Sequence, residues 1–490
     1  MRNFRSNSQS TPALIAGLRA ALVLSLAIVV ACSGGASTMK PAAGAGVVSV
    51  GAITGFGSVH LNGRIFQTTG TKITVNGQMA TQGDLRVGEV IQVSGHHDVA
   101  TNTDVADEIE YHDNVQGPVS SIDLNGQKLV VLGQNVLVSS DTSFGEGIMP
   151  ASLAGLAVGD IVEVSGMPQS NGDIQASRIE REPAGSPYRV TGTASGTDST
   201  AKHLMINSLT VDYSMAQLEG FTADGPKDGD LVEAFGTTLG SAGELLATKL
   251  ELRSDHDLTG ESDEDMDLEG LVTRFASATD FDVSGHPVTT TSTTTYVGGM
   301  STDLALNARV EIEGTVNSSG VLVATKVRFE RASATELVGQ ADAVDTVNNT
   351  VTVLGVTVTI TSMTRYEDQS DEGMSTFSLA DVHVGDWLKI RGDESPAGSN
   401  SLVATQLERI GTQTGVRIGG VVKTAAAPNF TILSVNIATT SMTEFGSPEG
   451  MVSSATFFTN LVGMPVWVQG TWDGTLLTAT KASFGDEGED

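Results

Sequence analysis

The chain repeats one short pattern six times along its 490 residues, and this repeat constrains the fold more than any other feature. In a clear copy, residues 158–166 read VGDIVEVSG, and five related segments also end at a glycine. The six terminal glycines are Gly95, Gly166, Gly236, Gly314, Gly392 and Gly470, with successive spacings of 71, 70, 78, 78 and 78 residues. Spacings this regular indicate tandem modules, each one supersecondary unit, rather than one large domain.

Each copy of the pattern predicts a strand that follows a tight turn. Apolar residues stand two and four positions before the terminal glycine, as at Val164 and Val162, and polar residues such as Glu163 mostly lie between them. This alternation is typical of an antiparallel strand with one buried face and one solvent-exposed face. Seven residues before the terminal glycine stands another glycine, or Asn307 in the fourth copy, which predicts a positive φ at that turn.

A second strand follows, and its pattern predicts a β-bulge. An alanine occurs 9 to 12 residues after each terminal glycine: Ala106, Ala176, Ala247, Ala324, Ala404 and Ala479. Apolar residues mostly lie two positions before this alanine and three positions after it, and such a change of step predicts a bulge that bends the strand. With two or three further strands from the first half of each module, we expect an all-β chain of about six small OB-like β-barrels. A small sandwich is the alternative.

The first 31 residues have the layout of a secretory signal. Arg2, Arg5 and Arg19 precede a 12-residue apolar core, Ala20 to Ala31, that is interrupted only by Ser25 and is too short to span a membrane. The segment ends Val29-Val30-Ala31-Cys32, and Cys32 is the only cysteine of the chain. The alternative is ordinary secretion with cleavage near an incidental cysteine.

Two resemblances follow from these residues. The segment ending at Cys32 resembles a bacterial lipobox, which implies lipid attachment at Cys32 and, with Ser33 next, sorting to the outer membrane of a Gram-negative cell. The repeat, a Gly-(Asp/Glu)-x-Val-x-Val-x-Gly strand followed by Ala-x-x-(Ile/Leu)-Glu, resembles the bacterial module called domain of unknown function 5666, over roughly residues 46–486. That family often occurs in tandem on exported lipoproteins and implies no activity, cofactor or catalytic residue.

The expected organisation follows from these boundaries. It comprises a signal peptide (1–31), a flexible tether (32–46), modules 1 to 3 (47–113, 114–184 and 185–254), an acidic linker (255–266) and modules 4 to 6 (267–332, 333–411 and 415–486). Beyond the leader the chain carries 24 Lys and Arg against 58 Asp and Glu, a net charge of −34. A chain so acidic repels phosphate backbones, so nucleic acid is not an expected partner.

No catalytic motif rises above the repeated background, so we expect no enzyme and no cofactor. The histidines worth testing as metal ligands are His96-His97-Asp98 and His112-Asp113, but polar turns commonly contain such residues and we expect no metal site. Residues 254–269 hold eight acidic residues without EF-hand spacing, which favours a solvated linker over a weak Ca²⁺ site.

Two further residue types raise the question of a ligand. One methionine falls in the loop region of each module: Met79, Met149, Met215, Met300, Met374 and Met451. Because Met fills irregular gaps, we interpret these as core residues rather than Cu(I) ligands. In the last module, Trp467 falls on an outward strand position and Trp472 in the following turn. They form either a ligand patch or a contact between modules.

The sequence therefore predicts a lipid-anchored, non-enzymatic protein of the cell envelope, facing the periplasm or the medium. Its expected role is to bind or display a partner, either an envelope protein or a surface glycan, through loops that differ among modules. A structural spacer without a specific ligand is the first alternative, and weak divalent-metal binding by the acidic linker is the second.

Replacing Cys32 tests the anchor. In cells grown with labelled palmitate, we expect the wild-type protein to carry label and Cys32→Ser to carry none, because the thiol is the acceptor of the lipid. Ser33→Ala, a change at the next residue, should keep the label. A labelled Cys32→Ser protein, or a free thiol in the mature wild type, would contradict lipid attachment.

Overall fold

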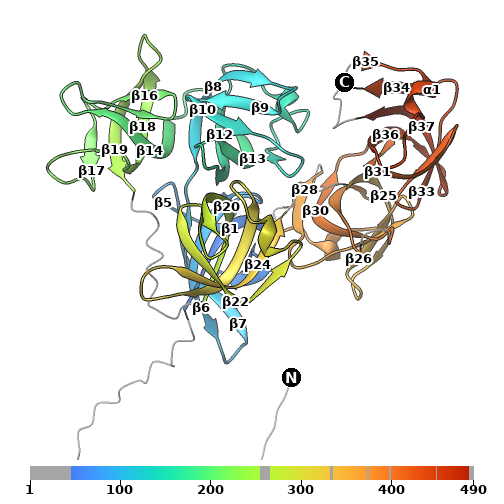
Figure 1. Cartoon of the computed structure of the whole chain (residues 1–490), viewed down its shortest axis with the longest axis horizontal. Coiled ribbons are helices and arrows are strands. Elements are labelled where there is room, and N and C mark those ends of the chain that lie inside the picture. The colour runs from blue at the N-terminus through green and yellow to red at the C-terminus, as the bar shows by residue number, and fades with distance from the viewer. Residues whose placement is uncertain are drawn as a thin grey trace, which may run out of the picture. The chain divides into compact units, whose positions relative to one another are not determined.

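The computed structural model describes residues 46–253, 265–330, 335–370, 372–374, 376–396, 399–447 and 450–484. The described residues all belong to one compact unit, residues 43–490. Cys32, the signal peptide and nearly all of the expected tether lie outside the described residues. Within them, strands make up almost all of the regular structure (Figure 1).

Modules 1 and 4 belong to the first of three sheets. Module 1 contains β1 (Gly46–Gly55), β2 (Val59–Leu61), β3 (Arg64–Gln67), β4 (Lys72–Val75), β5 (Gln78–Ala80), η1 (Gln82–Asp84), β6 (Val90–Asp98) and β7 (Thr103–Tyr111). Module 4 contains β20 (Asp265–Ser277), β21 (Asp280–Val283), β22 (His286–Val297), η3 (Ser301–Asp303), β23 (Arg309–Val316) and β24 (Leu322–Glu330).

Modules 2 and 3 belong to the second sheet. Module 2 contains β8 (Val115–Asp123), β9 (Lys128–Val131), β10 (Gln134–Leu137), β11 (Ser143–Phe144), η2 (Leu153–Gly155), β12 (Ile161–Pro168) and β13 (Ile174–Glu182). Module 3 contains β14 (Tyr188–Asp198), β15 (His203–Ile206), β16 (Leu209–Asp212), β17 (Gln217–Glu219), β18 (Leu231–Leu239) and β19 (Leu245–Leu252).

Modules 5 and 6 belong to the third sheet. Module 5 contains β25 (Thr335–Asp345), β26 (Thr350–Val353), β27 (Val356–Thr359), β28 (Arg365–Gln369), η4 (Leu379–Asp381), β29 (Trp387–Glu394) and β30 (Leu402–Ile410). Module 6 contains β31 (Val416–Ala426), β32 (Asn429–Ile432), β33 (Val435–Ala438), β34 (Glu444–Ser447), β35 (Gly450–Met451), α1 (Ser454–Phe457), β36 (Pro465–Trp472) and β37 (Leu476–Phe484).

Each module is a closed five-stranded barrel. In module 2 the ring runs β8–β9–β10–β13–β12 and back to β8, with only the β10–β13 pair parallel. The other five modules close in the same order, for example β31–β32–β33–β37–β36 in module 6. This is the OB-like order of strands, so the expected small barrels are confirmed.

The predicted bulge and turn are both present in every module. The pairing of the last two strands shifts register at the terminal glycine in all six copies. A Cβ built on Gly95 would lie 2.0 Å from the carbonyl oxygen of Val105, so the strands approach too closely there for any side chain. At the turn before the strand, Asn307 has φ 63° and Gly159 has φ 95°, as their substitution pattern predicted.

The barrels are not strung out singly but are joined in pairs through their first strands. The second strand of each barrel pairs only with the later half of the first strand, which leaves the early half with a free edge. In modules 2 and 3 these free edges pair with each other, Val115 opposite Val190, and β25 pairs with β31 in the same way. In modules 1 and 4, β1 pairs parallel with β20 instead. Covering a free edge satisfies its backbone groups.

The hydrophobic cores follow this pairing. One continuous cluster of buried residues fills modules 2 and 3, and another fills modules 5 and 6. Modules 1 and 4 keep separate clusters, although Val48 and Val50 of β1 pack against the core of module 4. Two of the three pairs therefore each share one hydrophobic core.

Two expectations about polar residues are wrong. The strand face between the apolar positions is not uniformly exposed, because Glu233 and Glu311 are buried beside cations, with Arg328 Nε 3.0 Å from Glu311 Oε2. The last five residues of the acidic segment 254–269 are not solvated linker but the start of β20. There Asp267 pairs with Arg64, and Glu269 Oε2 accepts a hydrogen bond of 2.9 Å from the Ala52 amide of module 1.

A methyl group at the bulge tests this architecture. We expect Gly95→Ala to lower the free energy of unfolding by about 1–3 kcal/mol, because its Cβ would overlap the Val105 carbonyl. Gly83→Ala, in the same module, meets only Thr81 Oγ1 at 3.7 Å and should change stability by less than about 0.5 kcal/mol. Equal stability of the two variants in urea unfolding would refute the close approach.

Candidate binding groove between modules 5 and 6

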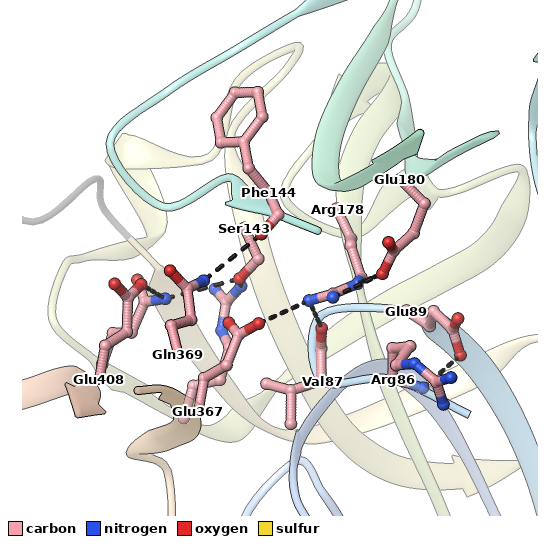
Figure 2. A network of polar contacts seen from close by, with 12 residues as sticks. Arg86, Val87, Glu89, Ser143, Phe144, Arg178, Glu180, Glu367, Gln369 and Glu408 are labelled. Atoms are coloured by element: carbon pink, nitrogen blue, oxygen red, sulfur yellow. Dashed lines mark hydrogen bonds and ion pairs between the residues drawn. The ribbon is translucent and has the colours of Figure 1, made fainter. Parts of the chain in front are cut away.

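Modules 2 and 5 meet through buried arginines. Figure 2 shows its centre, the guanidinium of Arg178. Arg178 Nη1 donates hydrogen bonds of 2.9 Å to the Val87 carbonyl of module 1 and of 2.9 Å to Glu367 Oε1 of module 5. Its Nε donates to Glu180 Oε1 at 2.5 Å. One buried cation thus joins three modules.

The two modules use the same surface toward each other. Ser143 pairs with Arg178 in module 2 as Arg365 pairs with Gln406 in module 5, and Arg178 and Gln406 each stand two residues after the bulge alanine. Arg365 Nη1 donates to the Asp141 carbonyl (3.0 Å) and to Ser143 Oγ (3.3 Å). Removing one partner would leave a buried charge uncompensated, so the contact specifies how the modules meet.

Three buried carboxyl groups, one beside this contact and two in module 4, have a pKa above the ordinary value. Burial raises the pKa of Glu89 to about 8, against the opposing effect of a hydrogen bond from the Arg86 amide, 2.8 Å away. Burial also raises the pKa of Glu311 to about 8 and that of Asp267 to about 6. Glu89 and Glu311 therefore bind protons near neutral pH, whereas Asp267 does so in weakly acidic solution.

A groove with a volume of about 760 Å³ lies where modules 5 and 6 join. The loop 149–152 of module 2 forms one wall, and β29, β30 and residues 411–413 form the floor on the side of module 5. β31, β36 and β37 complete it on the side of module 6. The side chains that reach it are mainly cationic, amide and aromatic: Gln369, Lys389, Glu408, Gln413, Arg417, Trp467, Gln469 and Lys481.

Trp467 lies opposite a glycine, and the absence of a side chain there makes room for its indole ring. Trp467 lies across from Gly419 in the β31–β36 ladder, and a Cβ built on Gly419 would lie 2.2 Å from Trp467 Cζ3. The indole therefore rests directly on the backbone of β31, because only glycine leaves room for it. An aromatic ring placed in this way provides a rigid surface for the apolar part of a ligand.

Three cations line the groove together with Trp467. Arg417 lies on β31 with its side chain 41 % exposed, and its Nη2 is 4.0 Å from Glu336 Oε1, a carboxylate that also accepts a 3.0 Å hydrogen bond from Arg391. Lys389 Nζ lies 3.8 Å from Glu408 Oε2, and Lys481 follows on β37. With three cations against Glu408 among its lining residues, the groove is a basic site on a chain of net charge −31.

This arrangement suits the recognition of an anionic group beside an apolar one. Fixed cations and amide groups bind carboxylates or other anions, and the indole binds apolar surface beside them. The described residues contain no group of three or more His, Cys, Asp or Glu side chains able to hold a metal ion. The groove offers fixed positive charge and an aromatic face.

The two tryptophans of the sequence analysis lie apart. Trp472 is on the opposite face of β36 and packs against the shared core of modules 5 and 6. Its Cζ2 would be 3.7 Å from a Cβ on Gly355, in a turn of module 5. Trp472 thus contacts the neighbouring module, and only Trp467 lines the groove.

The histidine candidates do not converge. His96 Nδ1 lies 2.9 Å from Asp107, whereas His97 Nδ1 lies 2.8 Å from Asp104. His112 lies beside Glu233, with 3.9 Å between Nδ1 and Oε2, and Asp113 accepts a hydrogen bond from Arg189. Each histidine is next to a separate carboxylate, and the His112-Asp113 segment takes part in a contact with module 3.

The methionines are not core residues, so that interpretation is wrong. Five of the six are strongly exposed, from 65 % for Met300 to 88 % for Met215, and only Met374 packs against a core. Their loops project from separate barrels, and the bulge and turn glycines already allow the barrels to close without a filler residue.

Sequence reasoning missed Arg417, Lys389 and Lys481 because each stands at a polar position of a regular strand. Such positions look like ordinary solvent-exposed residues in a single barrel. The available signal was a comparison between copies: at the central polar position of the strand pattern, modules 2, 3 and 4 carry glutamate, whereas module 5 carries Lys389 and module 6 carries Trp467.

Comparisons with known proteins agree with the repeat. Five segments match the family model described as domain of unknown function (DUF5666): residues 45–110, 116–180, 269–328, 338–408 and 419–482. Together they cover more than half of the chain. Module 3 lies between the second and third segments and closes in the same strand order as the others. No curated protein matches the chain. In the part of the chain that the structure describes, no helix is long and apolar enough to cross a membrane.

The buried carboxyl groups predict an acid-stabilised protein. For Glu89, Glu311 and Asp267 the folded-state pKa lies above the ordinary value, so their contribution to stability is complete below that value and is lost as pH rises through about 6 to 8. We expect the free energy of unfolding to fall by several kcal/mol between about pH 5.5 and pH 8.5.

Glu89→Gln should make the free energy of unfolding depend less steeply on pH, because the amide resembles the protonated acid. Glu146→Gln, a change at an exposed carboxylate, should leave its slope unchanged. Stability that stays constant or rises with pH in urea unfolding, or an unchanged slope in Glu89→Gln, would show that these groups are not buried as described.

Proposed function

We propose, for a chain that belongs to the DUF5666 family, that the protein is a non-enzymatic binding protein of the cell envelope, tethered by a lipid at Cys32. We propose further that it holds an anionic partner in the groove between modules 5 and 6. The observation that carries this proposal is that Lys389, Arg417, Lys481 and Trp467 line one groove. A strongly acidic chain repels anions generally, so a partner of this sign needs a local basic site.

Polar contacts between modules 2 and 5 also hold one wall of the groove in place. Its wall at residues 149–152 belongs to module 2, which the buried arginine contact holds against module 5. Gln369 lines the groove and donates a 3.4 Å hydrogen bond to the Phe144 carbonyl of module 2. A site whose walls are held by buried polar contacts loses less conformational entropy when a ligand binds.

Retention on immobilised polyanions tests the proposal. We expect the mature chain to be retained by polygalacturonate or by poly-L-glutamate at about 50 mM salt, to pass through neutral dextran, and to be released as salt rises, because the attraction is screened. Arg417→Gln combined with Lys481→Gln should weaken retention at least about tenfold, since two charge-assisted contacts are lost.

The control removes the same charge elsewhere. Lys72→Gln combined with Lys227→Gln alters two exposed lysines of modules 1 and 3 and should leave retention unchanged. An equal loss of retention in both double variants would show that retention depends only on the net charge of the chain. Retention on neither polymer would overturn the proposal in favour of a structural spacer.

A further inference from the structure

A second pocket, with a volume of about 390 Å³, lies where modules 1, 2 and 5 meet. Module 1 contributes Phe56 and residues 85–87, module 2 contributes residues 146–147 and part of β13, and module 5 contributes part of β28 and Phe377. Among the described residues, none lines both this pocket and the groove between modules 5 and 6. A volume of this size suits a small organic molecule.

One side of the pocket is aromatic and apolar. The ring of Tyr366 makes an edge contact with Phe377, with 6.3 Å between the ring centroids and 83° between the ring planes. Tyr366 also lies against module 1, because a Cβ built on Gly55 would be 3.7 Å from its Cδ2. Phe56 and Leu85, which belong to the core of module 1, line the pocket as well. Packing against two cores fixes these side chains as an apolar surface.

The other side of the pocket carries more negative than positive charge. Its charged lining residues are four carboxylates and two arginines: Glu146, Glu180, Glu367, Asp368, Arg86 and Arg178. Asp368 already has a cation of its own, because Arg409 donates a hydrogen bond to each of its carboxylate oxygens. The five remaining side chains carry three negative charges and two positive ones, which leaves a net charge of −1.

Figure 2 shows that Glu180 and Glu367 share one guanidinium, that of Arg178. The side chain of Arg178 is 5 % exposed, whereas those of Glu180 and Glu367 are 25 % and 11 % exposed. Glu367 Oε1 accepts its hydrogen bond from Arg178, but the buried Glu367 Oε2 has no hydrogen-bond partner in the part of the chain that the structure describes. Burying an unpaired carboxylate oxygen is unfavourable, so a positive charge placed in the pocket is stabilising.

The two sides together indicate the kind of cation that fits. The faces of aromatic rings attract positive charge, and the apolar surface of Phe56, Leu85 and Tyr366 favours a ligand that covers it. An inorganic ion satisfies only the carboxylates, because it offers no apolar surface to the rings. An organic cation satisfies both sides of the pocket.

We propose that this pocket binds a small protonated amine with an apolar body. The ammonium group lies beside Glu180 and Glu367 and supplies the positive charge that Arg178 alone does not. The apolar body lies against Tyr366 and Phe56. This inference goes beyond the anionic partner of the groove and does not depend on it, because the two sites have different lining residues and opposite charge.

Titration calorimetry with two probes of the same shape tests the inference. The probes are phenethylammonium and the neutral 2-phenylethanol, at pH 7 and constant ionic strength. We expect saturable binding of phenethylammonium to the full mature chain and at least about tenfold weaker binding of 2-phenylethanol, which lacks the charge-assisted contact. Equal affinity for the two probes, or no saturable binding of phenethylammonium at millimolar concentration, would overturn the inference.

Variants of the two module 2 carboxylates locate the site. Glu146→Gln combined with Glu180→Gln should weaken phenethylammonium binding at least about tenfold, because the lining then has no net negative charge. The control double variant is Glu219→Gln combined with Asp224→Asn, which alters two carboxylates of module 3 that are 41 % and 76 % exposed. This control should bind phenethylammonium as the wild type does. An equal loss in both double variants would contradict a local site.

The affinity for 2-phenylethanol distinguishes a loss of charge from damage to the pocket. It should stay the same in the Glu146 and Glu180 double variant, because the apolar side is unchanged. Glu146 is exposed, so Glu146→Gln is expected to melt like the wild type and tests the charge alone if the double variant melts lower. Unchanged phenethylammonium binding in these variants, or equal weakening of both probes, would overturn the inference.

Discussion

The free edge on the early half of each module's first strand is the constraint on which the described structure depends. A closed barrel normally leaves no edge, but here the second strand covers only the later half of the first. The remaining backbone groups must find partners, and in each case another module supplies them. Pairing first strand to first strand joins two barrels at a shallow junction, and the groove between modules 5 and 6 is one such junction. The pairing of the barrels and the position of the candidate groove therefore both depend on this incomplete ladder.

The buried arginines act at a second level. Arg178 and Arg365 occupy matching surfaces of modules 2 and 5, yet each makes different contacts, because residues at matching positions have diverged. Buried ion pairs contribute little net stability relative to apolar packing, but a mismatched pair is expensive. The contact between modules 2 and 5 therefore specifies how the two modules are arranged more than it adds to their stability. Divergence at matching positions is also the source of the groove, where Lys389 and Trp467 stand at the positions of Glu163 and Glu233.

The sequence was sufficient to predict what is local to one module. Residues that recur at regular intervals predicted three features: the bulge at each terminal glycine, the positive φ at Asn307 and the five-stranded barrel. Contacts between modules leave no such trace, because a polar residue that faces another barrel looks like one that faces water. Glu233, Glu311 and Asp267 were therefore expected in solvent, and Arg417 went unnoticed. Trp467 was identified because an outward aromatic residue is unusual, but its separation from Trp472 depends on which face of β36 each one occupies.

The parallel pairing of β1 with β20 has a consequence for the time course of folding. Ribosomes make the chain from its N-terminus, so the edge at Val47–Val50 exists long before Asp265–Leu268, the segment that covers it. Modules 2 and 3 can join as soon as both have emerged, because their partner strands are close in sequence. The module that is made first is thus completed only after the fourth. Until then it presents an unprotected template to other newly made chains.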